Sequence, residues 1–273
     1  MERSADAASR RADMPEGSGK ILNTRALRTA YRRLAEILRP GMTVLDVGCG
    51  TGAITRGMAE AVAPDGHVVG IDVNRRLIDE ARRTHGHVSG LAFEVCDVYR
   101  VPYQHNFDVV TAARCLQWLA DPLGALRSMA AALKPGGRMA VLDYNHEKIV
   151  WQPPPPQSMQ TFYTAFLRWR ADAGMDNAIA DHLYGLFDAV RLVDIRDTPQ
   201  HEETHRTDPD FVIRISLWAE VAAGRGHQMV ADGIISAAQR AAAEADYRAW
   251  IRESAESQTL YLIATEGRRP ETC

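Results

Sequence analysis

The sequence predicts an α/β fold, in which a parallel sheet carries helices on both faces and a helical cap follows in the same domain. Two observations support this class. Between residues 43 and 144, short apolar runs alternate with segments of helical periodicity, a pattern typical of parallel sheets covered by helices. After residue 144 a run of four prolines interrupts the alternation, and mostly helix-like segments follow.

The expected strands of the core are five apolar runs, each ending in or near a small or polar residue. Buried strands end in this way where they deliver a loop to the carboxyl edge of a sheet. The runs are TVLDV, HVVGID, LAFEV, FDVVT and RMAVLD. Asn74 can cap the helix after the second strand, and Asp121 with Pro122 opens the helix after the fourth. An amphipathic helix precedes the first strand and presents Leu27, Tyr31, Leu34 and Leu38 on one side.

The second half of the chain supplies the cap. Four prolines at 153–156 predict an extended spacer, with helices expected near residues 158–173, 210–223 and 236–253. Two late strands, at residues 189–195 and 259–265, extend the sheet. We therefore divide the chain into three parts: a disordered tail at 1–20, a leading helix with the α/β core at 21–145, and the cap with the last two strands at 146–273.

Composition excludes several partners. The chain has 32 Lys and Arg against 35 Asp and Glu, and a net charge of -3 supplies no field for a phosphate backbone or anionic lipid. We expect neither nucleic acid nor a membrane as partner. Residues 1–20 lack the apolar segment of an export signal, and no apolar run reaches about 18 residues, which favours a cytoplasmic protein. The four cysteines lack C-x-x-C spacing, so no metal site is expected.

The stretch from Asp46 to Gly52 reads D-x-G-x-G-x-G and joins the first strand to a helix. Glycines there let backbone N–H groups and the positive helix end approach a ligand closely. Asp72 ends the second strand, 20 positions after Gly52 (72 − 52 = 20), where its carboxylate can accept hydrogen bonds from both ribose hydroxyls. An adenosine ligand is therefore expected. A dinucleotide fingerprint, G-x-G-x-x-G, places its third glycine one position later.

Five ordered motifs resemble the class I S-adenosylmethionine-dependent methyltransferases, in particular their small-molecule, ubiquinone-biosynthesis-like branch. The matching pieces, within residues 38–144, are VLDVGCGTG, VVGIDVN, CDV, FDVVTAARCLQWLADP and ALKPGGRMAVLD. The resemblance implies a Rossmann-like sheet with a helical substrate cap, S-adenosylmethionine as cofactor, and methyl transfer to a small metabolite.

The resemblance also implies which residues hold the cofactor. The glycine turn would cradle its methionine and ribose, the end of the second strand would hold the ribose, and the end of the third would read the adenine. The residues after the fourth strand would approach the methionine portion. These cofactor-binding residues are Asp46, Gly48, Cys49, Gly50, Thr51, Gly52, Asp72, Val73, Asp97, Val98, Ala113 and Arg114.

Methyl transfer from a sulfonium is an in-line displacement, so positioning and water exclusion can supply most of the acceleration. A hydroxyl or thiol acceptor would also profit from a base. His146, which follows Asp143 and Tyr144 at the expected carboxyl edge, is the best candidate. The alternative is a loop histidine bonded to water. Many relatives carry a histidine pair where this chain has Gln117 and Trp118, so no catalytic role follows from that position.

The cap holds eight aromatic residues that could line an apolar pocket for an aromatic acceptor or form the core of the cap. Both interpretations stay open at this point. These residues are Phe162, Tyr163, Phe166, Trp169, Phe211, Trp218, Tyr247 and Trp250. The expected partner is a small-molecule methyl acceptor, and a homodimer is left open.

One competing motif is HEETH at residues 201–205, which matches the H-E-x-x-H pattern of zinc proteases. That pattern requires a partly buried helix, whereas Pro199 and Pro209 flank this polar segment. We interpret it as a strand end or loop. Two other functions also remain: an NAD(H)-dependent oxidoreductase on a similar sheet, and a scaffold that binds the cofactor without catalysis.

Overall fold

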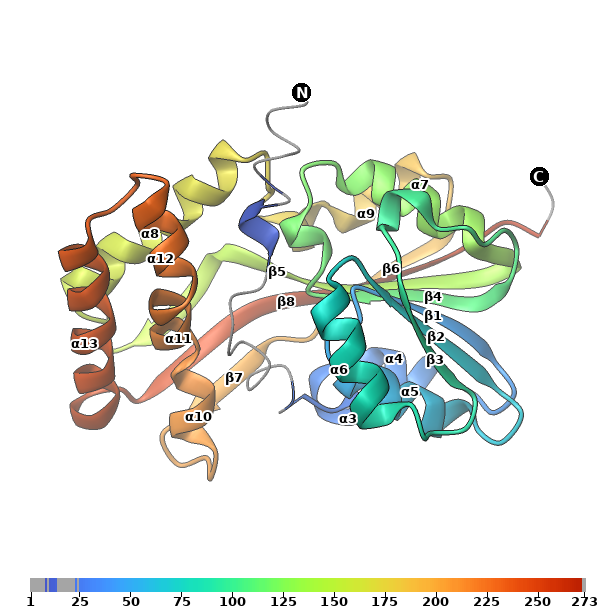
Figure 1. The fold of residues 1–273 in the computed structure, drawn as a ribbon, viewed down its shortest axis with the longest axis horizontal. Helices are drawn as coiled ribbons and strands as arrows, with labels where there is room; N and C mark the ends of the chain where they lie inside the picture. Colours follow the sequence, from blue (N-terminus) through green and yellow to red (C-terminus); the bar gives the residue numbers. More distant parts are fainter. Residues whose placement is uncertain (1–7, 9, 14–22, 24, 272–273) are drawn as a thin grey trace.

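The computed structural model describes residues 8, 10–13, 23 and 25–271. Within them, eight strands form one sheet in the order β3-β2-β1-β4-β5-β8-β6, with β7 paired to β8 (Figure 1). The first five strands pair in parallel, and β8 runs antiparallel to β5, β6 and β7. The strands are β1 (Thr43–Val47), β2 (His67–Asp72), β3 (Leu91–Val95), β4 (Phe107–Ala113), β5 (Leu133–Gln152), β6 (Val193–Pro199), β7 (Glu202–His205) and β8 (Ser257–Arg268).

Helices cover both faces of this sheet, as predicted. On one face, α3 (Leu27–Ala30), α4 (Arg32–Ile37) and α5 (Ala53–Val62) pack on alternate residues of the central strands. On the other face lie α7 (Pro122–Ala132) and α9 (Ile179–Ala189). Phe93 on β3 packs with Ile78 and Ala81 of α6 (Arg75–His85). The predicted α/β class is therefore confirmed.

Local hydrogen bonds explain where several helices begin. The side chain of Asn74 accepts a bond from the Leu77 N–H and opens α6, while Asp121 accepts from Gly124 and opens α7. The predicted leading helix is interrupted at Tyr31, whose backbone is non-helical (φ −150°, ψ 64°) and separates α3 from α4. Its apolar side is nevertheless buried against the sheet as expected.

The cap lies at one end of the sheet, where β5 and β8 run on beyond the core (Figure 1). It consists of α8 (Gln157–Asp172), α10 (Phe211–Ile215), α11 (Leu217–Ala223), α12 (Arg225–Ala231) and α13 (Ala237–Glu253). All eight cap aromatics are buried in a single apolar cluster. They form the core of the cap, and two of them, Phe166 and Trp218, also pack against the ring of His146 on β5.

The fifth core strand, β5, is longer than the sequence suggested. β5 continues to Gln152, so Asp143, Tyr144 and His146 lie within a strand and not in a loop after it. The continuation pairs with β8 as far as Ser257. The hydrophobic pattern of the sequence could not predict this pairing, because the paired residues are far apart in the chain. Two helices, α9 and α12, were not predicted; neither has a side-chain cap that would mark its start.

Most of the tail predicted to be disordered lies outside the described residues. Of residues 1–20 the structure describes 8 and 10–13, and these pack against the cap, with Ala8 buried beside Ala173 and Met175. In the described part of the chain, no helix combines the length and the apolar character needed to cross a bilayer.

Candidate active site

The turn between β1 and α5 is built on three glycines with left-handed backbones: Gly48, Gly50 and Gly52 have φ of 71°, 56° and 78°. Close neighbours add a second constraint. A Cβ on Gly48 would lie 2.6 Å from the Cys115 sulfur, and one on Gly52 would lie 2.6 Å from the Phe93 ring. Glycine is therefore demanded by both the conformation and the packing of the turn.

Asp72 sits directly against this turn. One carboxylate oxygen accepts a hydrogen bond from the Gly50 N–H (3.0 Å), and the other accepts one from the Asn74 N–H (2.9 Å). Burial raises the pKa of Asp72, although these backbone bonds oppose the shift. The carboxylate is only half-buried, so its remaining lone pairs can accept bonds from ribose hydroxyls.

Asp46 is a buried carboxyl on β1, level with Gly70 of β2 and Thr111 of β4. Its Oδ2 accepts a bond from the Thr55 hydroxyl (2.6 Å). Burial raises its pKa to about 7, with a further contribution from the charge of Asp72. A positively charged ligand group beside Asp46 would relieve the cost of ionising it.

Four buried polar atoms near the carboxyl ends of β1 and β4 lack a hydrogen-bond partner among the described residues. Leaving such an atom unpaired costs about 1–3 kcal/mol. They are Tyr31 OH, Thr51 Oγ1, Thr111 Oγ1 and Arg114 Nη1. Together with the close-packed turn and the two carboxylates, these atoms fit the polar amino-acid end and the ribose of S-adenosylmethionine.

The predicted adenine side of the site is more open. Asp97 is exposed and accepts a bond from the Tyr99 N–H through one oxygen, which leaves the other free for an adenine amino group. Val98 next to it is buried, whereas Val73 at the end of β2 is 70% exposed. Cys49, half-buried, packs against Phe93 beneath the turn.

Ala113 ends β4, and Arg114 follows it with a left-handed backbone (φ 57°). Ala112, the residue before, pairs with Val47 at the start of the glycine turn. Arg114 is therefore beside the turn, and its side chain is buried (6% exposed).

His146 is bonded to a side chain that the sequence did not single out as a partner. Its Nε2 lies 2.6 Å from Gln117 Oε1, and the same oxygen accepts a bond from Arg170 Nη1 (3.2 Å). An amide oxygen can only accept hydrogen bonds, so His146 Nε2 must be the donor in this contact. Nε2 therefore carries the hydrogen, and Nδ1 carries the lone pair. Nδ1 has no partner among the described residues.

The interpretation of His146 as a loop residue bonded to water is wrong. The ring is buried in β5 between its neighbours, and burial together with the charge of Arg170 lowers its pKa well below the ordinary value. Asp143 lies close by and accepts bonds from the backbone N–H groups of Gln117 and Tyr144. Burial raises the pKa of Asp143 to about 6.

Two arginines of the cap helices, Arg170 and Arg225, lie over the ring of Trp118. Arg170 is fully buried, with its guanidinium 4.6 Å from the centre of the Trp118 ring, and Arg225 lies 3.8 Å from the same ring. Burial lowers their pKa values to about 10 and about 9. No motif marks these arginines, because each belongs to a cap helix and meets Trp118 only after folding.

Four residues of the HEETH segment, 202–205, form the strand β7. β7 pairs antiparallel with β8, with Glu203 opposite Thr259, so the segment is not the helix that the zinc motif requires. Among the described residues, no group of three or more His, Cys, Asp or Glu side chains could hold a metal ion.

Comparison with known proteins agrees with this geometry. A family model described as a methyltransferase domain matches residues 38–183, a little more than half of the chain. The ubiquinone/menaquinone biosynthesis C-methyltransferase UbiE of Vibrio campbellii is 38% identical over 111 residues, covering 39% of this chain and 43% of the relative. The chain thus spans less than half the length of such curated relatives.

Solved structures share the fold at low identity. Haemonchus contortus phosphoethanolamine N-methyltransferase 2, solved with phosphomonomethylethanolamine and S-adenosylhomocysteine, has a TM-score of 0.55 at 17% identity, over 94% of this chain and 54% of that one. The cyclase SpnF has a TM-score of 0.53 at 22% identity, over 91% and 85%. With the family model, these findings confirm the predicted fold and family: the chain belongs to the methyltransferase-domain family.

Proposed function

We propose that this protein transfers a methyl group from S-adenosylmethionine to a small-molecule acceptor by in-line displacement. The observation that carries the proposal is the contact of the Asp72 carboxylate with the Gly50 N–H. It closes the glycine turn against the acidic end of the next strand, the arrangement that an adenosyl ligand needs. The NAD(H) alternative loses its support, because the family model is that of methyltransferases.

Each of the predicted residues would bind a different part of the cofactor. Asp72 would accept bonds from the ribose hydroxyls, and Asp97 would accept one from the adenine amino group. Asp46 and Arg114 would face the charged amino-acid end. When bound, the cofactor supplies an electrophilic methyl group, so the task of the protein is to align the acceptor and exclude water.

His146 is the proposed base or hydrogen-bond acceptor for the acceptor molecule. Its bare Nδ1 can take a hydrogen bond from a hydroxyl or thiol, and its lowered pKa keeps it neutral over the physiological range. A base of low pKa suits an acceptor whose proton is acidic. Aromatic rings surround it: Tyr144 at 5.2 Å, Trp218 at 6.1 Å and Phe166 at 6.2 Å between ring centres. An acidic hydroxyl or thiol on an apolar framework would match these surroundings.

The test is transfer of a labelled methyl group. The full chain is incubated with methyl-labelled S-adenosylmethionine and a metabolite extract, and mass spectrometry identifies any product that gains the label. Asp72→Ala should abolish labelling, while Asp65→Ala, at an exposed position, should not change it. Cofactor binding without any labelled product would instead favour a cofactor-binding scaffold or, by analogy with SpnF, another reaction.

A further inference from the structure

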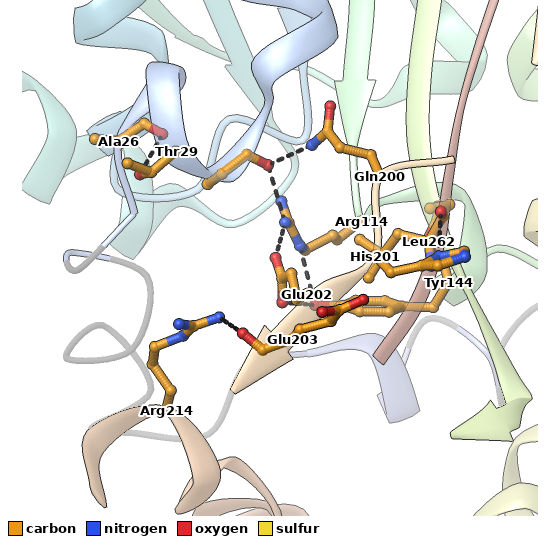
Figure 2. Close-up of polar contacts among 12 residues, drawn as sticks. Ala26, Thr29, Arg114, Tyr144, Gln200, His201, Glu202, Glu203, Arg214 and Leu262 are labelled. Carbon is orange, nitrogen blue, oxygen red and sulfur yellow. Dashed lines mark hydrogen bonds and ion pairs between the residues drawn. The ribbon is translucent and has the colours of Figure 1, made fainter. Parts of the chain in front are cut away.

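Arg114 is held on one side and unpaired on the other. Its Nε donates to the Tyr144 hydroxyl (3.0 Å), and its Nη2 donates to the Ala30 carbonyl (3.0 Å) and pairs with Glu202. Figure 2 shows the contacts of the guanidinium with both Glu202 and Tyr144. By contrast Nη1 is buried and has no partner within the described residues. A buried charged donor needs an acceptor, and here the folded chain does not supply one.

Arg114 adjoins the glycine turn in space. The next residue, Cys115, is so close to the glycine turn that a Cβ on Gly48 would strike it. Tyr31 links the two regions: its hydroxyl is buried, and the charges of Asp46 and Arg114 both influence its pKa. Asp46 and Arg114 therefore both lie near the Tyr31 hydroxyl, one as an acid and the other as a cation.

A ligand group with opposite charges at two ends would satisfy both residues. The amino-acid end of S-adenosylmethionine carries a carboxylate and an ammonium, and a guanidinium recognises a carboxylate through parallel N–H bonds. We propose that Arg114 binds this carboxylate through Nη1, and that Glu202 is the positioning residue that holds the guanidinium in the required orientation. This inference rests on the proposed function.

Glu202 is suited to this role by its place in the fold. It lies on β7, in the segment noticed for its zinc-like pattern, and β7 is held to β8 by the register Glu202 with Leu260. Burial opposes its ionisation, but Arg114 and Arg25 together lower its pKa, so it stays charged. The second contact, from the Tyr144 hydroxyl to Glu202 (3.4 Å), fixes the carboxylate further. A strand outside the cofactor motifs thus orients a cofactor-binding side chain.

The test compares two ligands that differ only in the amino-acid end. S-adenosylhomocysteine carries it, whereas methylthioadenosine keeps the adenosine and the sulfur but lacks the charged groups. Calorimetric titrations are made on the full-length wild type, Arg114→Met, Glu202→Gln and the control Glu203→Gln. Glu203 is the matched control because it is the next residue on β7 and its side chain is largely exposed.

Arg114→Met should weaken S-adenosylhomocysteine binding by about 10- to 100-fold, the worth of a charged hydrogen bond, and leave methylthioadenosine within about twofold. Glu202→Gln should weaken the first ligand by about 3- to 10-fold with the second unchanged, because the guanidinium is still present but less firmly held. Glu203→Gln should change neither. Thermal unfolding establishes whether each variant is folded. If Arg114→Met does not fold, the result for Glu202→Gln tests the inference.

Equal weakening of both ligands would overturn the inference, because it would mean a structural role only. Unchanged S-adenosylhomocysteine binding in both variants would overturn it as well, and an effect confined to the KM of the acceptor would assign Arg114 to the acceptor instead. A folded wild type that binds neither ligand would refute the proposed function itself. The two failures are therefore distinguishable.

Discussion

His146 Nε2 and Gln117 Oε1 are 2.6 Å apart in a buried environment, and this contact joins strand β5 to the short turn after β4. Gln117 also accepts from Arg170 and donates through Nε2 to the Arg114 carbonyl (3.2 Å). One amide thus connects the candidate base, a buried cap arginine and the backbone of the cofactor loop.

Gln117→Ala should destabilise the protein, because it leaves the His146 and Arg170 donors buried without their acceptor. The expected loss of unfolding free energy is about 2–4 kcal/mol, since unpaired buried groups cost about 1–3 kcal/mol each. Urea unfolding measures it. Gln104→Ala, at an exposed position, should stay within about 0.5 kcal/mol of wild type. Equal stability of the two variants would contradict the network.

His146 should make stability depend on pH in the acid range. Its folded pKa is lowered, so below the ordinary value of 6.5 the unfolded chain binds a proton that the folded chain does not. The contribution is fully present above pH 6.5 and is lost as the pH falls. Relative to His146→Gln, the wild type should therefore lose unfolding free energy between pH 8 and pH 5. His87→Gln, at an exposed site, should follow wild type, and parallel curves for all three would disprove the assignment.

Asp46 should act in the opposite direction. Burial raises its folded pKa to about 7, so the folded state holds a proton that the unfolded state has released, and stability falls as the pH rises from 4 through 7. Without cofactor, Asp46→Asn should therefore gain stability over wild type on going from pH 5 to pH 8, by an amount on the order of 2–4 kcal/mol. The same variant should bind S-adenosylhomocysteine weakly. A pH-independent difference would refute the raised pKa.

Gly52→Ala separates packing from backbone strain when it is compared with Gly41→Ala. Both glycines have left-handed backbones, but a Cβ on Gly41 meets nothing within 4 Å, whereas one on Gly52 strikes Phe93 at 2.6 Å. Gly41→Ala should cost about 1–2 kcal/mol through the backbone alone. Gly52→Ala should cost more in urea unfolding and should abolish S-adenosylhomocysteine binding in calorimetry. Equal costs would show that Phe93 gives way.

The cofactor half of the candidate site could be predicted because its signals are local. The glycine turn and Asp72 each sit at a strand end, and in a parallel sheet neighbouring strand ends meet at one edge. Their predicted proximity appears as the Gly50 to Asp72 hydrogen bond. The capping residues Asn74 and Asp121 were predictable for the same reason, since each acts within four residues of itself.

The other half could not be predicted in this way. Arg170 reaches Gln117 across 53 positions, and Glu202 reaches Arg114 across 88. Such pairs leave no periodicity in the chain, because they depend on how the cap helices and β7 are placed by the pairing of β8 with β5. The aromatic cap residues show the same limit. Their spacing predicted apolar helix faces, but only the structure shows that these faces pack together in one buried cluster.

By itself, the sequence determined the α/β core, the glycine turn after β1 and the family, since these follow from strand periodicity, glycine conformations and the order of five motifs. The tertiary structure alone decided which tautomer His146 adopts, which atom of Arg114 is left without a partner, and that residues 202–205 of the HEETH segment form a strand beside the site. These depend on hydrogen bonds between segments far apart in the chain, and such bonds are set by three-dimensional packing.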